Sequence, residues 1–263
     1  MPPLVPPAAA LALSESPAVD PLAIVQTFID EAVPHLLDMD GLRYRISHDL
    51  NEWCEIITHA PRTDGRNAAF TPGETAPPDD AYWVCVEHRD GRIAGISAGR
   101  YLDTDMGFYD YVRAGRLWWP GRPDIPVIPA HPGPKGRLAH TGGLWVSPDF
   151  AGIGLSWLLP RLNHGLALLR WNLDWAVGIA FPSIIQKGVT ANYGAEAMEL
   201  MIDAPGLGPG GRRAIMYALP NSRGFLIDRT WGDLLNIRRE QDQKMRHFAP
   251  FAKRKDEAAV RGH

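Results

Sequence analysis

The sequence predicts an α+β fold in which helices flank a mixed, mostly antiparallel sheet. The clearest observation is a hairpin whose strands, AYWVCVEH and IAGISAGRYL, are joined by a turn at Asp90-Gly91. A second observation is one strand–helix–strand unit over residues 138–181, with antiparallel strands on both sides of it in the chain. With 263 residues, the chain can bury a sizeable core and most often forms one domain.

Before the hairpin, the sequence predicts two helices and a short strand. Asp20 followed by Pro21 is a favourable helix start, and Pro34 is expected to kink or end that helix. The other elements expected here are a disordered lead-in over 1–19, a strand over 42–46, a helix through Trp53 and Ile57, and a polar loop over 61–80.

The segment 103–136 is unusually rich in aromatic residues and proline. It is interpreted either as an ordered excursion with its own aromatic cluster or as a mobile lid. Because it enters directly before the strand at 138–146, it is a candidate wall of an acceptor-binding site, although most Trp side chains belong to a core.

The second half of the chain alternates strands and helices. The glycine pair Gly142-Gly143 inside strand 138–146 indicates a bulge. The elements expected after it are a helix with a leucine stripe over 155–169 that contains Pro160, a buried strand over 173–181, a helix from Pro182 to Tyr193-Gly194, strands over 197–202 and 213–219, and a charged helix over 233–255.

Composition excludes several classes of function. The formal net charge of −3 gives no overall positive field for nucleic acid or acidic membranes. No run of eighteen apolar residues predicts a membrane span, and the N-terminus lacks the basic region of a secretory signal. Cys54 and Cys85 are expected to be buried thiols in a reducing cytoplasm, and the histidines show no metal-ligand spacing.

The segment GLWVSPDFAGIGLSW, from Gly143 to Trp157, carries the strongest functional signal. A strand ends at Val146, a Pro-Asp-Phe turn follows, and Gly152-Ile153-Gly154 leads into a helix. Such a turn points consecutive backbone N–H groups outward at a helix N-terminus, where the helix dipole also favours negative charge. The two glycines let the backbone approach an anion closely. The sequence therefore predicts a phosphate-binding turn.

This pattern resembles motif A of the GCN5-related N-acetyltransferases (GNAT), in which Arg or Gln-x-x-Gly-x-Gly or Ala leads into a helix. The positions that match are Val146, Pro148, Asp149, Phe150, Gly152, Gly154 and the pair Leu158-Leu159. The order of elements also matches over residues 22–220, which implies a GNAT-like domain over 20–220 followed by a helical extension over 221–263. Two positions depart: Ala151 replaces Arg or Gln, and Ser156 replaces Gly or Ala.

A dinucleotide-binding fold competes for the same glycines. The third glycine of GxGxxG is missing, because Trp157 occupies its place. Asp174 has the spacing of the acidic residue that binds ribose, but it precedes its strand. The antiparallel hairpin before the motif also does not belong in a doubly wound sheet, so the acyltransferase interpretation is favoured.

The resemblance implies acetyl-CoA or another acyl-CoA as co-substrate, with no metal. The CoA lies where two central parallel strands, 138–146 and 173–181, splay apart. Main-chain groups of Leu144 and Val146 would pair with the pantetheine arm, N–H groups from Gly152 to Ser156 would bind the pyrophosphate, and a backbone N–H at the bulge could stabilise the oxyanion. The implied cofactor-binding residues are Leu144, Trp145, Val146, Ala151, Gly152, Ile153, Gly154, Leu155 and Ser156.

The catalytic side chains are less clear from the sequence. An amine with a pKa of about 10 needs a base, and related enzymes place a Glu on the strand before motif A. Here His140 is the candidate, with an ordinary pKa of about 6.5, unless it only hydrogen-bonds its neighbours. The Tyr that usually meets the leaving thiolate would fall at Thr190; Tyr193, one turn later, either takes that role or packs at a helix end.

The sequence therefore predicts a cytoplasmic acyl-CoA-dependent N-acyltransferase, most simply an N-acetyltransferase, acting on a small-molecule or peptide amine. The alternative is a catalytically silent acyl-CoA-binding or regulatory protein of the same fold, which the departures at Ala151 and the missing Glu and Tyr favour. No nucleic acid or membrane partner is expected, and a homodimer is left open.

Overall fold

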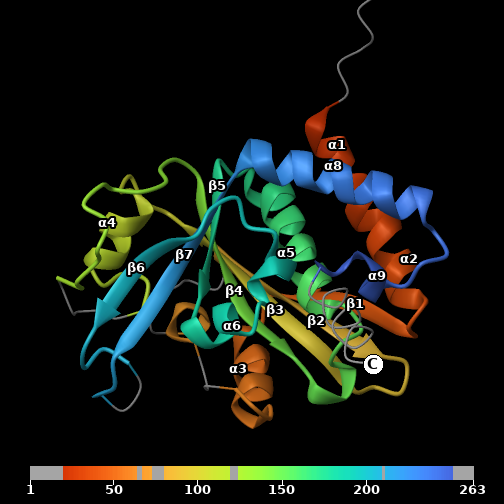
Figure 1. The fold of residues 1–263 in the computed structure, drawn as a ribbon, viewed down its shortest axis with the longest axis horizontal. Coiled ribbons are helices and arrows are strands. Elements are labelled where there is room, and N and C mark those ends of the chain that lie inside the picture. Colours follow the sequence, from red (N-terminus) through yellow and green to blue (C-terminus); the bar gives the residue numbers. More distant parts are fainter. Residues whose placement is uncertain (1–19, 64–66, 73–79, 119–123, 209–210, 251–263) are drawn as a thin grey trace, which may run out of the picture.

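In the computed structural model, which describes residues 20–63, 67–72, 80–118, 124–208 and 211–250, seven strands form one sheet. Its spatial order is β1-β2-β3-β4-β5-β7-β6 (Figure 1). All neighbours pair antiparallel except β4 and β5, which are parallel. The predicted mixed, mostly antiparallel sheet is confirmed, and a doubly wound sheet is excluded. The strands are β1 (Leu42–Ser47), β2 (Ala81–His88), β3 (Ile93–Leu102), β4 (Leu138–Val146), β5 (Trp175–Ala180), β6 (Glu199–Ala204) and β7 (Ala214–Ser222).

The two parallel strands splay apart in the middle of the sheet. They pair over three positions, from Leu138 opposite Trp175 to His140 opposite Val177. From Thr141 onward, β4 keeps its pairing with β3 but has no partner on the β5 side within the described residues. The implied splay of the central parallel strands is therefore present. Asp174, just before β5, accepts hydrogen bonds from the Arg137 guanidinium, which fixes the start of the pair.

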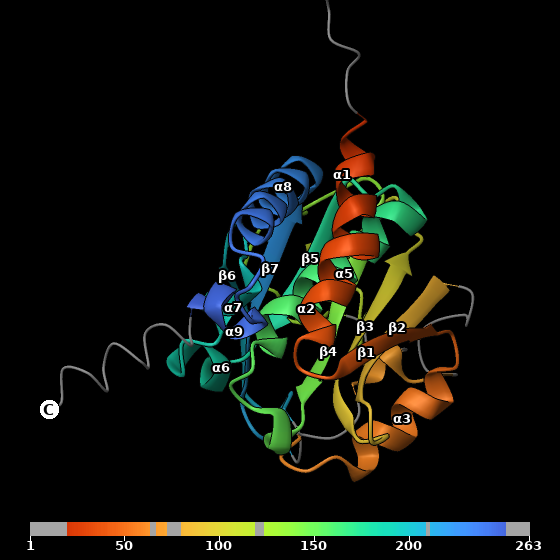
Figure 2. The same cartoon turned by 90° about the vertical axis from the view of Figure 1, so that its right-hand side faces the viewer.

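One face of the sheet is covered by α1 (Pro21–Thr27), the π-helical turn η1 (Phe28–Ala32), α2 (Val33–Asp38), α5 (Leu155–Trp171) and α8 (Arg223–Arg239) (Figure 2). Helix α5 packs on β3 and β4, and α1 lies against both α5 and α8. Pro34 does not end the first helix: the π-helical turn precedes it, and α2 continues to Asp38. Helix α5 begins at Leu155 and contains Pro160.

The opposite face holds a second apolar core beneath α3 (Leu50–His59), the short turn η2 (Ala68–Phe70) and α4 (Phe108–Arg113). The described part of the 103–136 segment is an ordered excursion, because Phe108 and Tyr109 are fully buried there. Its returning segment forms an isolated antiparallel bridge to β6, where Val127 pairs with Ile202. Residues 119–123, including Trp119, lie outside the described residues.

Two predicted helices are wrong in their bounds. The helix expected from Pro182 to Tyr193 is divided into α6 (Pro182–Gln186) and α7 (Thr190–Tyr193), because Gly188 between them has a left-handed φ of +74°. The charged helix expected over 233–255 instead begins at Arg223, where the Ser222 hydroxyl caps α8, and α8 ends at Arg239. A separate short helix, α9 (Met245–Phe248), follows.

Other sequence expectations concern single features. Cys54 and Cys85 are buried free thiols, as predicted. The lead-in expected over 1–19 and the end of the helix expected to reach Lys255 lie outside the described residues. No helix in the described ranges is long and apolar enough to cross a membrane.

Candidate active site

The predicted bulge in β4 is confirmed. Ile96 and Ala98 of β3, two positions apart, face Trp145 and Gly142, which are three positions apart. The extra residue is accommodated by Gly143, whose φ of +57° is left-handed. The bulge lies just beyond His140, where β4 and β5 separate, so it stands at the opening of the splay.

The loop after β4 forms the predicted cradle at the N-terminus of α5. The Ser147 N–H donates to Ala94 O (2.9 Å), and a single turn, η4 (Pro148–Phe150), follows. Gly152 and Gly154 have left-handed φ angles of +86° and +105°. Within the described parts of the chain, no protein acceptor takes the N–H groups of residues 152–156. Unsatisfied N–H groups at a helix start bind anions, so this loop suits a phosphate.

Helix α9 packs directly against this cradle. A Cβ built on Gly154 would lie 2.9 Å from the backbone nitrogen of Arg246 and 2.9 Å from the carbonyl carbon of Met245. Phe248 stacks on Trp157 of α5, with ring centroids 5.9 Å apart. This contact brings an exposed Arg246 beside the loop that holds Ala151, the position where the resemblance implies Arg or Gln.

The other implied cofactor-binding residues lie in one continuous path. Trp145 and Val146, with Leu144, occupy the half of β4 that is no longer paired with β5, and the Trp145 Nε1–H donates to Pro61 O (3.0 Å). In the cradle, the Ser156 hydroxyl accepts a hydrogen bond from Asn192 Nδ2 (2.8 Å), which ties the first turn of α5 to α7. The splayed edge of β4 thus leads directly into the predicted phosphate loop.

His140 is buried, with 1% of its surface exposed. Its Nδ1–H donates to the Val177 carbonyl (2.9 Å), so the neutral ring presents a lone pair at Nε2. The ring stacks on Phe70 (centroids 5.2 Å apart) and meets the edge of Trp118. Burial lowers the pKa of His140 to about 4, which makes it a weaker base than an ordinary histidine with a pKa of about 6.5.

Thr190 and Tyr193 lie on α7 and are half-buried. Burial raises the pKa of Tyr193 to about 12, so the hydroxyl keeps its proton at neutral pH. Among the described residues, no hydrogen bond or ring contact joins either side chain to His140. The structure therefore does not assemble these three residues into one catalytic group.

Sequence reasoning missed a buried polar chain behind the splay. Arg229 Nη2 donates to Nδ1 of His164 (3.0 Å), so the Nε2–H of His164 donates to the Thr141 hydroxyl (3.1 Å). Arg229 also donates to the carbonyls of Tyr193 and Gly194. Burial and the neighbouring Arg229 hold the pKa of His164 well below its usual range. These hydrogen bonds couple Thr141, the first residue of β4 that is not paired with β5, to α5, α7 and α8.

A second missed residue is Trp53, on α3. Its ring is fully buried and lies edge-on to Phe70, with centroids 5.7 Å apart. A Cβ built on Gly143 would lie 2.8 Å from Trp53 Cζ2, so this indole borders the bulge. The sequence gives no signal for this position, because Trp53 reads as one apolar residue of a helix far from β4 in the chain.

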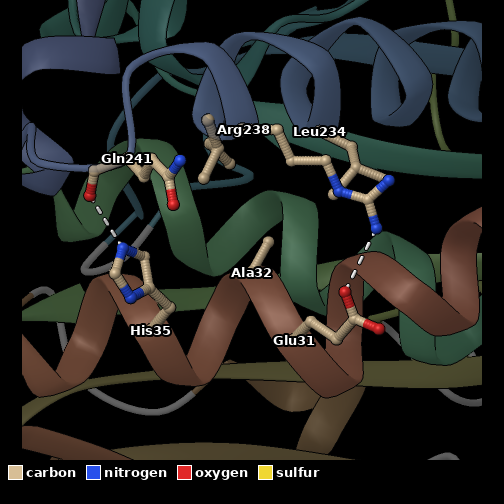
Figure 3. Close-up of a pocket in the computed structure, with 7 residues that line it drawn as sticks. Glu31, Ala32, His35, Leu234, Arg238 and Gln241 are labelled. Carbon is tan, nitrogen blue, oxygen red and sulfur yellow. Dashed lines mark hydrogen bonds and ion pairs between the residues drawn. The ribbon is translucent and has the colours of Figure 1, made fainter.

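A separate surface pocket of about 280 Å³ lies between the first helical segment and α8 (Figure 3). Two contacts bridge it: Arg238 donates to Glu31 (3.1 Å), and His35 Nε2 lies 2.8 Å from Gln241 O. It lies on the outer side of the helical layer and contains none of the predicted site residues. We regard it as a gap between packed helices.

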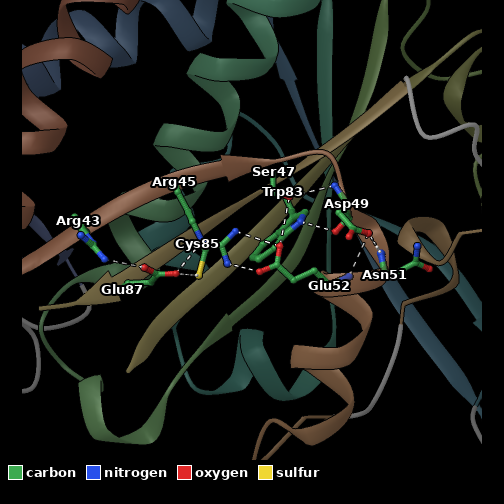
Figure 4. Close-up of polar contacts among 9 residues, drawn as sticks. All are labelled: Arg43, Arg45, Ser47, Asp49, Asn51, Glu52, Trp83, Cys85 and Glu87. Carbon is green, nitrogen blue, oxygen red and sulfur yellow. Dashed lines mark hydrogen bonds and ion pairs between the residues drawn. The ribbon is translucent and has the colours of Figure 1, made fainter. Parts of the chain in front are cut away.

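A polar network crosses the edge of the sheet at β1 and β2 (Figure 4). Arg45 donates to Glu87 (2.8 Å) and to Glu52 (2.5 Å), and its guanidinium lies over the Trp83 ring. Burial raises the pKa of the Cys85 thiol beside Glu87 to about 12, so Cys85 is not a nucleophile. This network joins α3 to the sheet. Within the described residues, no group of three His, Cys, Asp or Glu side chains could hold a metal.

A mixed seven-stranded sheet with a splayed parallel pair and an anion cradle after β4 is the architecture that the GNAT resemblance implies. No protein-family model and no curated protein sequence matches the chain. Two experimentally solved structures with a similar fold come from Vibrio cholerae: mutant forms of the spermidine/spermine N-acetyltransferase SpeG, and a spermidine N-acetyltransferase in complex with CoA and spermine. Each is 11% identical; they cover 73% and 72% of this chain and 99% of their own, at TM-scores of 0.44 and 0.41.

A third is AAC(6')-Ib in complex with paromomycin and acetyl-CoA, which is 16% identical and covers 73% of this chain and 98% of its own at a TM-score of 0.41. TM-scores this low support no conclusion about activity. The fold therefore rests on the strand order and on the geometry of the splay and cradle.

Proposed function

We propose that this protein is an acyl-CoA-dependent N-acyltransferase that moves an acetyl or other short acyl group to an amine. The observation that carries the proposal is the continuous path from the unpaired edge of β4 to the cradle at α5. An extended pantetheine arm is a strand-like ligand that the main chain of Leu144 and Val146 can pair with, and the pyrophosphate fits the N–H groups of residues 152–156.

The surroundings of the cradle also favour an anion, because they leave space for it and offer a positive charge. A Cβ on Gly152 would meet nothing within 4 Å, so the loop faces open space there. Arg246, carried by α9, offers a cation where Ala151 offers none. We propose that Arg246 supports the phosphates in place of the Arg or Gln that the resemblance implies at Ala151.

At the bulge, a backbone N–H near Gly142-Gly143 would meet the thioester oxygen, and His140 Nε2 would accept a proton from the amine. Tyr193, which keeps its proton at neutral pH, is the candidate donor to the leaving thiolate. A cytoplasmic location and a homodimer stay predictions.

The test combines binding and turnover on the full chain. Calorimetry with acetyl-CoA should show saturable binding, and release of free thiol should depend on an added amine. Binding without turnover across a panel of amines would favour the second candidate, a silent acyl-CoA-binding protein. The specific observation behind that candidate is the low pKa of His140, which among the described residues has no hydrogen bond or ring contact to Tyr193. Absence of binding would refute both.

A further inference from the structure

Two buried polar atoms that have no hydrogen-bond partner among the described residues flank the β4 bulge. They are Nε1 of Trp53 and Nε2 of His140, on side chains that are 0% and 1% exposed. Leaving a buried polar group unpaired costs about 1–3 kcal/mol, so most buried groups find partners. Two unpaired atoms beside one bulge therefore indicate that a ligand supplies the missing bonds.

Both atoms face the bulge from the side opposite α5. A Cβ on Gly142 would lie 3.4 Å from His140 Nε2. A Cβ on Gly143 would lie 3.4 Å from Cε2 of Trp53, the carbon bonded to Nε1, and 2.8 Å from Cζ2, the next carbon of the ring. The glycine pair leaves room that any side chain would fill.

The two atoms have complementary chemistry. The indole Nε1–H can only donate a hydrogen bond. The imidazole of His140 already donates through Nδ1–H to Val177 O, so its Nε2 can only accept while the ring is neutral. A ligand at the bulge must therefore bring one acceptor and one donor. An acyl carbonyl beside an attacking amine has this pattern.

Aromatic side chains border the bulge on this side, and the charged group that lowers the pKa of His140 is an arginine. Phe70 lies between Trp53 and His140, with ring centroids 5.7 Å and 5.2 Å away, and Trp118 meets His140 edge-on. Among the described residues, no carboxylate is hydrogen-bonded to Trp53 or His140. The charged group that acts on His140 is Arg100, which is 3% exposed and is itself attracted by Asp80.

We propose that the acyl acceptor is an uncharged aromatic amine, an amino group attached directly to an aromatic ring, held at the bulge by His140 while Trp53 Nε1–H binds the acyl carbonyl. This inference rests on the proposed acyl transfer. A cationic aliphatic amine would enter a buried place beside the charged Arg100, where no described carboxylate is hydrogen-bonded to Trp53 or His140. An aromatic amine is neutral at pH 7, packs against Phe70 and Trp118, and needs no strong base to remove a proton before attack.

The step is balanced without another reactant. The amine nitrogen attacks the thioester carbonyl carbon, the C–N bond forms and the C–S bond breaks. One N–H proton passes to His140 Nε2, and the departing sulfur takes a proton from the Tyr193 hydroxyl, so the products are an aryl amide and free CoA thiol. Solvent then carries the proton from His140 back to Tyr193. Trp53 Nε1–H donates to the carbonyl oxygen as negative charge develops there.

A panel of three acceptors tests the substrate class. Thiol release from acetyl-CoA is followed with 4-methoxyaniline, with 4-methoxybenzylamine, which is similar in size but cationic, and with spermidine. The expected kcat/KM for the aniline is at least about tenfold above that for either cation, the scale of discrimination that one unfavourable buried contact provides. A preference for either cation, or no turnover with any of the three while acetyl-CoA binds, would overturn the inference. Loss of acetyl-CoA binding would instead refute the proposed function itself.

A matched pair of tryptophan variants tests the donor. Trp53→Phe keeps an aromatic ring and removes only the N–H, so kcat for 4-methoxyaniline should fall about 100-fold, as for one lost oxyanion donor, with KM unchanged. Trp83→Phe is the control, because that Nε1–H is also buried but is satisfied by Asp49 O (2.8 Å). Equal kcat for wild type and Trp53→Phe, or a rise in KM alone, would refute the role of Trp53.

Discussion

Gly152 and Gly154 share a left-handed backbone but differ in their surroundings, so alanine at each position measures the packing of α9 on the cradle. A Cβ at Gly152 (φ +86°) would meet nothing within 4 Å. A Cβ at Gly154 (φ +105°) would lie 2.9 Å from backbone atoms of Met245 and Arg246, which cannot rotate away as a side chain can.

The expected losses follow from these two environments. Alanine in the left-handed region costs about 1–2 kcal/mol at either site. At Gly154 the added methyl also forces α9 to shift, and overpacking of this kind costs about 1–3 kcal/mol more. Gly152→Ala should therefore lower the free energy of unfolding by about 1–2 kcal/mol and Gly154→Ala by about 2–5 kcal/mol.

Urea unfolding followed by circular dichroism measures both losses. In a chain that ends at Lys244 and so lacks α9, the difference between the two variants should disappear, because the backbone atoms that the methyl meets are gone. Equal losses for the two variants in the full chain would refute the contact between α9 and the cradle. So would a difference that persists in the shortened chain.

Three further outcomes are expected. Asp233→Ala leaves the buried Arg161 without its ion-pair partner at 2.7 Å and should lower the free energy of unfolding by about 3–5 kcal/mol. The control is Glu31→Ala, which breaks an exposed ion pair with Arg238 and should cost about 0–1 kcal/mol. Similar urea midpoints for the two variants would contradict this prediction. Arg246→Ala should weaken acetyl-CoA binding about tenfold in calorimetry, whereas kcat/KM with S-acetyl-N-acetylcysteamine, which has no phosphates, should stay unchanged. The control variant is Arg239→Ala on α8. An unaltered Kd of Arg246→Ala for acetyl-CoA would show that Arg246 does not contact the phosphates. The pKa of His140 falls from about 6.5 in the unfolded chain to about 4 in the folded protein, so between these pH values the unfolded state binds one more proton and the protein becomes less stable as the pH falls. Acidifying from pH 7 to pH 5 should therefore lower the free energy of unfolding by about 2 kcal/mol through this residue. A His140→Gln variant whose stability has the same pH dependence would contradict this prediction.

Local sequence signals predicted the parts of the fold that local chemistry determines. The Asp90-Gly91 turn set the β2–β3 hairpin, and Gly142-Gly143 marked the bulge because only glycine readily adopts its left-handed backbone. The cradle was predictable for the same reason.

Where helices begin was harder to predict. Helix α8 contains Gly224 and Gly232 and several arginines, so its first ten residues lack a continuous apolar stripe. It forms because Ser222 caps it and because Leu226, Leu234 and Ile237 are buried against the rest of the helical layer. Tertiary packing therefore outweighs the weak local preference.

The candidate site was predictable in its backbone and only partly in its side chains. His140 was identified from its position on β4, but its lowered pKa results from Phe70, Trp118 and the fold around them. Trp53 and the chain from Thr141 through His164 are brought to the splay by contacts between distant segments, which periodicity does not report.

The short parallel pairing of β4 and β5 leaves two strand edges inside the molecule. An open edge on a protein surface is a template for pairing with another chain and a risk of aggregation. Here the same hydrogen-bonding potential is enclosed between β3 on one side and β7 on the other, where a second folded chain cannot reach it. An extended ligand that offers strand-like donors and acceptors would be able to pair with these edges, as the proposed pantetheine arm does. Backbone pairing in the splay would therefore restrict the shape of the ligand, in addition to any contacts that side chains make with it.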